Sequence, residues 1–383
     1  MPAGGEIHLE MAEFRLLREL FNEHCGILFG PEARPILERR LRDRISQLGL
    51  HSFSEYYQLL RFEERGRSEL DEATDLITIN ETYFFREMYQ LRAYREEVLP
   101  MLRVGASARD RLSVWSAGCS TGEEVYSIAM LTREAGLYPS RSVRVFGSDI
   151  SRRCVVQARR GIYGPSAFRA IPPEMRRRYF YDRPEGMHVV EELRALCQFG
   201  QLNLLDSARA SVVGRVDVIF CRNVMIYFDE ESRRRVIEMF YDRLLPGGFL
   251  LLGHSESLLN ISTAFELVHL REDLVYRKPI TATRPGASYR PGVAEPRVAM
   301  SSLPEARAAM SSLPEARATM PSLSGAEGRA TMPSLSGAEG PLSASRFGAA
   351  PRALRPFEGL SSLSPRVQPS KPSSPPGTGG DKR

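Results

Sequence analysis

The chain of 383 residues lacks several features that would place a protein in a special class. Its five cysteines are scattered, odd in number and without CxxC spacing, which argues against both disulfides and a zinc site. No apolar run approaches the roughly 20 residues that cross a bilayer, and Met1–Glu6 has neither the basic start nor the apolar core of a secretory signal. We therefore expect a cytoplasmic protein with no membrane insertion and no metal.

Net charge is also scarce in most of the chain. From Ile280 onward there are 13 Lys and Arg against 7 Asp and Glu, so residues 1–279 carry only −1 within the total of +5. A nucleic-acid-binding domain needs a basic face on its folded part. We therefore expect no nucleic-acid partner.

Hydrophobic periodicity divides the rest of the chain into two parts. Apolar residues recur at helical spacing over residues 8–75, as at Phe14, Leu17 and Phe21, which predicts a small all-helical N-terminal domain. Over residues 76–279 apolar strand patterns alternate with helical ones, which predicts an α/β domain.

The last hundred residues have a different composition. They are rich in Pro, Ser, Ala and Gly, and the segment Met300–Arg307 is repeated from Met310. Apolar residues are too sparse there to bury a core, so residues 280–383 are predicted to form a disordered tail with short repeats. A flexible linker and a docking motif for a partner are both open interpretations of this tail.

Seven strands and three helices are predicted in the α/β domain. The strands are Leu112–Ser116, Val143–Ser148, Gln198–Leu204, Val216–Phe220, Phe249–Gly253, Phe265–His269 and Leu274–Arg277. The helices are Glu123–Glu134, Arg152–Arg159 and Glu230–Leu245, with Pro246–Gly248 as the turn that follows the last. Alternation favours a parallel sheet covered by helices, with one antiparallel strand from the final hairpin. Residues of about 175–200 interrupt this pattern and predict an inserted β-hairpin subdomain.

The segment Val114–Glu124 joins the first strand to a helix through small residues. Gly118 and Gly122 permit positive φ and leave room for a ligand beside the backbone. Glu123 and Glu124 then open the helix with negative charge. This turn favours a nucleotide-like molecule that carries positive charge over a pyrophosphate.

Polar residues follow the other strands at the edge where open α/β sheets bind ligands. Asp149 ends the second strand and is placed to accept ribose hydroxyls. Asn203 and Leu204 end the third and are placed to flank an adenine ring, and Arg222–Phe228 follows the fourth. A lone acid at a strand end is often only a helix cap, but several such ends in order favour a nucleoside site.

The segment Asn80–Glu87, before the first strand, combines polar residues with three aromatic residues and Arg86. One interpretation is a capped helix start whose aromatic rings join the core. The unusual combination favours a second one, in which this segment contacts the ligand.

These motifs resemble those of the chemotaxis receptor methyltransferases of the CheR type, over about residues 10–279. The resemblance is carried by Asn80–Glu87, Trp115–Met130, Phe146–Tyr163, Cys221–Phe228 and Pro246–Leu258. It implies a Rossmann-like class I methyltransferase sheet that binds S-adenosyl-L-methionine and yields S-adenosyl-L-homocysteine. It further implies methyl transfer to glutamate side chains of methyl-accepting chemoreceptors, by a protein that we expect to be a monomer.

The resemblance also implies roles for individual residues. Arg86 and Tyr227 are expected near the reacting methyl group, where Tyr227 would aim the incoming carboxylate. The expected cofactor contacts are Asn80, Thr82, Arg86, Glu123, Asp149, Asn203, Leu204, Arg222 and Asn223.

Two features concern recruitment of the receptor. The basic helix with Arg39, Arg40, Arg42 and Arg44 resembles the part of the family that faces the receptor, with Arg40 and Arg44 as expected contacts; a solvated helix face is the alternative. Family members that tether to a receptor peptide do so through the inserted hairpin, whose turn near Asp182–Met187 is short here. Recruitment is then expected to use the tail or direct contact.

Two other functions remain alternatives. Gly118–Gly122 satisfies the G-x-S-x-G pattern of α/β-hydrolases, with Ser120, Asp217 and His254 as an ordered triad. That elbow follows the first strand rather than several, and Asp217 lies within its strand. The other alternative is a module that binds the cofactor without catalysis.

Overall fold

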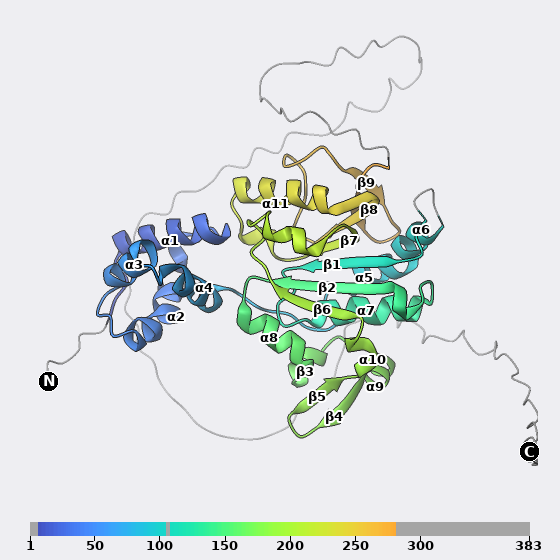
Figure 1. Cartoon of the computed structure of the whole chain (residues 1–383), viewed down its shortest axis with the longest axis horizontal. Helices are drawn as coiled ribbons and strands as arrows, with labels where there is room; N and C mark the ends of the chain where they lie inside the picture. The colour runs from blue at the N-terminus through green and yellow to red at the C-terminus, as the bar shows by residue number, and fades with distance from the viewer. Residues whose placement is uncertain (1–6, 105–107, 281–383) are drawn as a thin grey trace, which may run out of the picture. The chain divides into compact units, whose positions relative to one another are not determined.

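The structure is a computed structural model of the chain, and it describes residues 7–104 and 108–280 (Figure 1). The repeat-bearing tail predicted over residues 280–383 therefore lies outside the described residues, apart from Ile280. The predicted domain bounds of 8–75 and 76–279 stay a prediction.

The N-terminal part of the described chain is helical. Its helices are α1 (Met11–Cys25), α2 (Arg34–Gln47), α3 (Phe53–Phe62) and α4 (Gly66–Ile77), with a short 3₁₀ turn before α2. Ser52 caps α3 by accepting the Glu55 N–H at 3.1 Å. The apolar stripes of the helices meet in one core, formed by Leu9, Phe14, Leu17, Leu20, Phe21, Leu37, Leu41, Ile45, Phe53, Tyr56, Leu59, Leu60, Leu70, Ala73 and Ile77.

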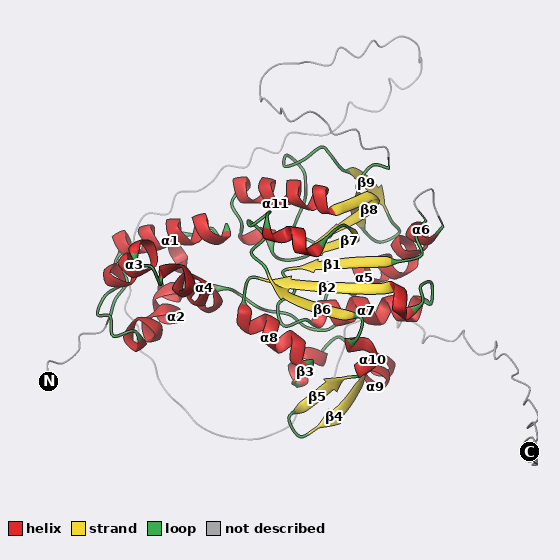
Figure 2. Ribbon diagram, viewed as in Figure 1, coloured by secondary structure: helices red, strands yellow, loops and turns green. Residues whose placement is uncertain are grey.

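A seven-stranded sheet forms the centre of the second part (Figure 2). In spatial order its strands are β6 (Cys197–Gln201), β2 (Val143–Asp149), β1 (Leu112–Ala117), β7 (Val216–Cys221), β8 (Leu244–Leu252), β10 (Leu274–Arg277) and β9 (Glu266–His269). The pairs from β6 to β8 are parallel, and β10 is antiparallel to both of its neighbours. The predicted parallel sheet with one antiparallel strand is confirmed.

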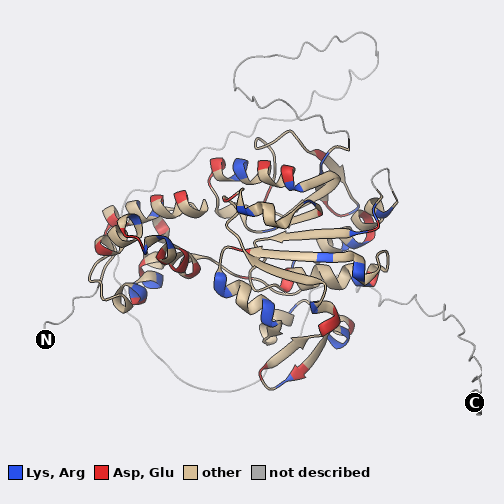
Figure 3. Ribbon diagram, viewed as in Figure 1, with Lys and Arg blue, Asp and Glu red and all other residues tan. Residues whose placement is uncertain are grey.

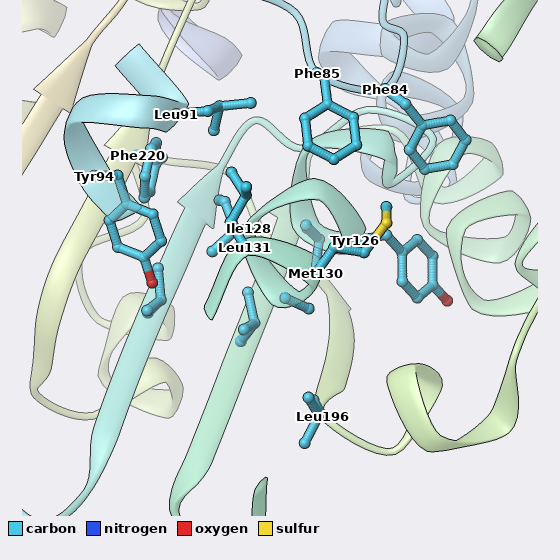
Figure 4. Close-up of a cluster of buried hydrophobic side chains, with 14 of the residues drawn as sticks. Phe84, Phe85, Leu91, Tyr94, Tyr126, Ile128, Met130, Leu131, Leu196 and Phe220 are labelled. Atoms are coloured by element: carbon cyan, nitrogen blue, oxygen red, sulfur yellow. The ribbon is translucent and has the colours of Figure 1, made fainter. Parts of the chain in front are cut away.

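Alternate residues of the strands face two different cores. On one face, Val114 and Val218 pack against α5 (Met88–Ala93), a π-helical turn (Tyr94–Val98), α6 (Leu99–Arg103) and α7 (Glu123–Ala135). Figure 4 shows part of this cluster, with the aromatic rings of Phe84, Phe85 and Tyr94 beside α7 side chains. On the other face, Trp115 packs edge-on against Phe240 of α11 (Glu230–Arg243), with ring centroids 5.3 Å apart. Both faces of the sheet are thus covered.

A small antiparallel sheet is inserted between β2 and β6. Its strands, in spatial order, are β3 (Ile162–Tyr163), β5 (Gly186–Val189) and β4 (Phe180–Arg183), accompanied by α9 (Pro173–Tyr179) and α10 (Glu191–Arg194). The residues between β2 and β3 form α8 (Arg152–Arg160). Only Pro184 and Glu185 lie between β4 and β5, so the hairpin turn is as short as the sequence indicates.

Several boundaries differ from the sequence prediction. The strand predicted over Gln198–Leu204 is β6, which ends at Gln201, so Asn203 and Leu204 lie in the loop after it. The last helix was predicted to reach Leu245, with Pro246–Gly248 as a turn, but α11 ends at Arg243 and β8 already begins at Leu244. The reason is a long-range pairing, because the Gly247 N–H donates to the Lys278 carbonyl and the Lys278 N–H to the Gly248 carbonyl. The pairing of β8 with β10 therefore continues past Arg277 to Lys278 and includes the two glycines. Among the described residues, no helix is long and apolar enough to cross a membrane.

Candidate active site

A deep cavity opens where the carboxyl ends of the parallel strands meet. It encloses about 1110 Å³, its open mouth included. The loops after β1, β2, β6 and β7 line it, together with residues 77–86 and a segment that follows α1. Of the residues that the sequence singled out, those lining this cavity are Asn80, Thr82, Arg86, Asp149, Asn203, Leu204, Arg222, Asn223 and Tyr227.

The turn after β1 is shaped by backbone conformations that require glycine. Gly118 has φ +81°, and a Cβ there would collide with the Cγ2 of Val224. Gly122 has φ +95°, and a Cβ there would lie 2.8 Å from the Cβ of Ala158. The Gly118 N–H donates at 2.8 Å to the carbonyl of Ser148 on β2, so the turn is anchored to the neighbouring strand.

Asp149 is the carboxylate at the end of β2. Its Oδ2 accepts the Ser120 N–H at 2.7 Å and its Oδ1 accepts the Ser151 N–H at 2.9 Å. Burial raises the pKa of this carboxyl to about 6, although the two amides oppose the shift. Each carboxylate oxygen keeps a second lone pair, so Asp149 can still accept hydroxyl groups of a ligand.

Arg222 is the centre of a buried polar network, with 1% of its side chain exposed. Its Nη1 lies 3.1 Å from Oε2 of Glu124, and its Nη2 lies 3.1 Å from Oε2 of Glu87. Its Nε donates to the Gln90 side chain at 2.7 Å, and Nη2 also donates to the Arg86 carbonyl at 2.6 Å. The guanidinium thus joins the loop after β7 to α7 and to the segment before α5.

The acidic pair at the start of α7 is divided between two roles. Glu123 accepts the Thr121 hydroxyl at 2.7 Å, is 4% exposed, and is not among the residues that line the cavity. Glu124 lines the cavity, accepts the Ser116 hydroxyl at 2.7 Å and pairs with Arg222. Burial raises the pKa of both carboxyls. The sequence predicts Glu123 as the cofactor contact, but the residue that lines the cavity is its neighbour Glu124.

Arg86 differs from Arg222 in its partners. Its Nη1 donates to the Glu81 carbonyl at 2.9 Å, and its guanidinium lies 6.0 Å from the Tyr83 ring centroid. Within the described part of the chain, Arg86 and Arg222 are the cations that line the cavity, and only Arg222 is paired with carboxylates. Arg86 is therefore the group available to bind a carboxylate of a ligand.

The remaining predicted contacts lie around the same cavity. Asn203 donates through Nδ2 to the His24 carbonyl at 2.6 Å, and Leu204 beside it is nearly buried. Asn223 has φ +59° and lies 3.3 Å from Glu87 through Nδ2. The Asn80 carbonyl accepts the Ser120 hydroxyl at 3.1 Å. The side chains of Asn203 and Asn223 thus connect segments of the cavity wall through hydrogen bonds as well as lining the cavity.

Sequence reasoning missed the segment Cys25–Phe29, which begins at the last residue of α1; Cys25, Ile27 and Phe29 line the cavity. Ile27 forms an isolated β-bridge with Phe228, and the Leu28 N–H donates to the Tyr227 carbonyl at 2.8 Å. These contacts span about two hundred positions of the chain, and no local pattern signals them.

Arg40 and Arg44, the expected receptor contacts, lie on α2 and are not among the residues that line the cavity. Arg40 donates to the carbonyls of Ile77 and Thr78 at 2.6 and 3.1 Å. Arg44 binds both carboxylate oxygens of Glu69, at 2.8 and 2.5 Å. Both are used within the helical part, where Figure 3 shows basic residues interspersed with acidic ones over α1–α4. Arg39 is exposed and has no hydrogen bond or ion pair among the described residues.

The structure does not assemble the hydrolase triad. The Ser120 hydroxyl donates to the Asn80 carbonyl, and His254 is exposed in the loop after β8. Asp217 lies near the start of β7, at the opposite edge of the sheet, where it accepts the Ser113 N–H at 2.8 Å and pairs with Arg109 at 2.9 Å. The hydrolase alternative is therefore not supported.

The cavity is suited to a cationic nucleoside. Its walls carry the acids Glu124, Asp149 and Glu81 and the cations Arg86 and Arg222, while Leu202 and Leu204 add apolar surface. Arg222 is already neutralised by Glu87 and Glu124, and Glu81 pairs with Arg169, so in the described ranges of the chain Asp149 is the wall carboxylate that has no cation beside it. Among the described residues no group of three or more His, Cys, Asp and Glu is arranged to hold a metal ion.

Comparisons with known proteins agree with this chemistry. Residues 80–274 match the family described as "CheR methyltransferase, SAM binding domain", and residues 12–78 match "CheR methyltransferase, all-alpha domain". The chain is 37% identical over 279 residues to chemotaxis protein methyltransferase 2 of Vibrio cholerae, covering 72% of this chain and 96% of that protein. It is 34% identical over 272 residues to chemotaxis protein methyltransferase 1 of Pseudomonas aeruginosa, covering 70% of this chain and 97% of that protein.

Proposed function

The chain belongs to the CheR methyltransferase family and is an S-adenosylmethionine-dependent methyltransferase of chemotaxis; from this premise we propose that it methylates glutamate side chains of methyl-accepting chemoreceptors. The observation that carries the glutamate specificity is that Tyr227 and Arg86 line the same cavity, since Arg86 is a cation without a carboxylate partner there. A substrate that is itself an anion fits such a site.

We infer that the cofactor is held by the acidic walls of the cavity. Asp149 would accept ribose hydroxyls, Leu204 would pack against the adenine ring, and Glu124 would offset positive charge. S-adenosylmethionine supplies a methyl group bonded to a positively charged sulfur. The proposal also includes the other cofactor contacts expected from the sequence, which are Asn80, Thr82, Asn203, Arg222 and Asn223. Glu123 is included because it lies next to Glu124.

A glutamate side chain ionises near pH 4.3, so it is already nucleophilic at neutral pH and no general base is needed. The task of the protein is then to orient this carboxylate and to exclude water. Tyr227 would donate a hydrogen bond that aims the carboxylate, and Arg86 would hold either that group or the cofactor's own carboxylate. Tight pairing would lower nucleophilicity, so orientation matters more than affinity.

The decisive test is to incubate the purified chain with receptor-bearing membranes and methyl-labelled S-adenosylmethionine, and then to add base. A methyl ester of a carboxylate hydrolyses in base, so we expect labelled methanol to be released. Labelled protein that releases no methanol would show methylation of another group, whereas no labelling at all would favour the binding module without catalysis.

Tyr227→Phe removes the hydroxyl and keeps the ring. If Tyr227 orients the substrate, kcat falls by about 10- to 100-fold, the value of one hydrogen bond to a charged group. Affinity for S-adenosylhomocysteine stays unchanged, because the cofactor contacts lie elsewhere. Steady-state kinetics and calorimetry measure the two quantities; equal kcat in the variant and the wild type would refute the role.

Charge changes on α2 separate receptor binding from stability. We propose that the helix meets the acidic methylation region of the receptor, with Arg40 and Arg44 at its margin. Arg39→Glu should then raise the KM for receptor several-fold at low salt without lowering thermal stability, because Arg39 is exposed and unpartnered. Arg44→Ala should instead lower stability, since Glu69 is 7% exposed and loses its cation, while it keeps the Tyr56 hydroxyl as a donor. An unchanged receptor KM for both variants would place the receptor elsewhere.

Location and assembly are part of the same proposal. All five cysteines are free, which supports a reducing compartment such as the cytoplasm. The monomeric state stays a prediction, which light scattering on the purified chain tests.

A further inference from the structure

Glu256 lies in the loop after β8 and reaches across to the loop after β7. Its carboxylate accepts five backbone N–H groups, four of which belong to consecutive residues of that neighbouring loop. Oε1 accepts the N–H groups of Val224, Met225 and Ile226 at 2.9, 2.7 and 3.3 Å, and Oε2 those of Asn223 and Gly253 at 2.9 and 2.7 Å.

This arrangement explains how an irregular segment keeps one conformation. Asn223 has φ +59°, and Met225–Tyr227 forms a single 3₁₀ turn whose first N–H groups have no partner within the turn. Left unpaired, these amides would cost free energy in the folded protein, up to about 1–3 kcal/mol at Met225, which is buried; Asn223 and Val224 are half-buried and Ile226 is exposed. One carboxylate satisfies them together, and its charge strengthens each bond.

The same segment carries Tyr227. On the far side of the turn the Tyr227 carbonyl accepts the Leu28 N–H at 2.8 Å, so the backbone around Tyr227 is fixed from two directions. Glu256 is not among the residues that line the cavity, and its effect on a substrate must therefore be indirect.

We propose that Glu256 is a positioning residue for methyl transfer, which holds Tyr227 in place through the backbone of Asn223–Ile226. The proposal rests on the role given to Tyr227 above. It differs from a purely structural role, because the loss of Glu256 should matter only as long as the Tyr227 hydroxyl is present.

Glu256→Gln is the informative variant because glutamine has the same shape. The glutamine amide has one oxygen where the carboxylate has two. Its NH₂ group takes the place of the second oxygen, and it cannot accept hydrogen bonds from the N–H groups that this oxygen now binds. Asp217→Asn is the matched control. Asp217 is also a buried carboxylate that accepts a backbone N–H, and it lies on β7 near the opposite edge of the sheet.

A double-mutant cycle with Tyr227→Phe tests the proposal. We expect Glu256→Gln to lower kcat for receptor methylation at least about tenfold, the equivalent of 1.4 kcal/mol, whereas Asp217→Asn lowers it less than about twofold. The variant with both substitutions should be no slower than the slower single variant. The proposal would be overturned if the fold-loss in kcat of the double variant equalled the product of the two single fold-losses. It would also be overturned if Glu256→Gln had the kcat of the wild type.

Hydrogen exchange provides a readout that is independent of activity. The backbone amides of residues 223–226 should exchange faster in Glu256→Gln than in the wild type, and at the wild-type rate in Asp217→Asn. If Glu256→Gln does not fold, Glu256→Asp replaces it in the cycle, since its shorter carboxylate cannot reach all five donors. A wild-type chain that releases no methanol would refute the proposed function, whereas multiplying losses would overturn only the role of Glu256.

Discussion

Arg222→Met is expected to lower the free energy of unfolding by about 3–5 kcal/mol and to abolish most cofactor binding. Methionine fills similar space but removes the charge and every N–H donor. Glu87 and Glu124, whose side chains are 18% and 15% exposed, then face each other without the cation that they share. Gln90 and the Arg86 carbonyl lose their donor in the same step.

Urea unfolding measures the first effect and calorimetry with S-adenosylhomocysteine the second. Arg277→Met is the control, because Arg277 pairs with Glu266 on the surface, with side chains 34% and 44% exposed. Such a pair contributes about 0–1 kcal/mol. The loss of stability in Arg222→Lys should lie between the losses in Arg222→Met and Arg277→Met. Lysine keeps the positive charge but lacks the planar guanidinium that reaches four acceptors. A stability of Arg222→Met within about 1 kcal/mol of the wild type would mean that the network contributes little to folding.

The sequence was sufficient to predict the sheet and the edge at which the cavity lies. Strand patterns repeat locally, and in a parallel sheet the carboxyl ends of the strands must meet at one edge. Asp149, which ends β2, and Asn203, which lies two residues after β6, therefore came together as predicted. The same logic found Arg222, because it follows β7 directly.

What the sequence could not decide is the direction of each side chain and the partners from distant segments. Glu123 and Glu124 are adjacent at the start of α7, and only the packed helix shows that Glu124 reaches the cavity. The segment Cys25–Phe29 and the carboxylate of Glu256 act across loops that share no local pattern with their targets. Arg44 looked like a surface charge, but Glu69 lies beside it on another helix.

Asp149→Asn should weaken the affinity for S-adenosylhomocysteine by about 10- to 100-fold at pH 7, and it should also remove a pH dependence. With a pKa of about 6, Asp149 of the free wild-type protein is about one-tenth ionised at pH 5, so a ligand that needs the ionised form binds about tenfold more weakly there than at pH 7. In Asp149→Asn no proton binds at this position, and affinity should change little over that range. Calorimetry at pH 5, 6 and 7 measures both trends.

The pH dependence of protein stability distinguishes weaker ligand binding at low pH from a loss of structure at low pH. Because the pKa of Asp149 is raised from 3.8 to about 6, the folded state binds the proton more tightly than the unfolded state. The contribution of Asp149 to stability is therefore largest at low pH and falls as the pH rises from about 4 to about 6. Ligand affinity through Asp149 changes in the opposite direction over this window. A wild-type affinity that is constant between pH 5 and 7 would mean that Asp149 does not accept ligand hydroxyls in its ionised form.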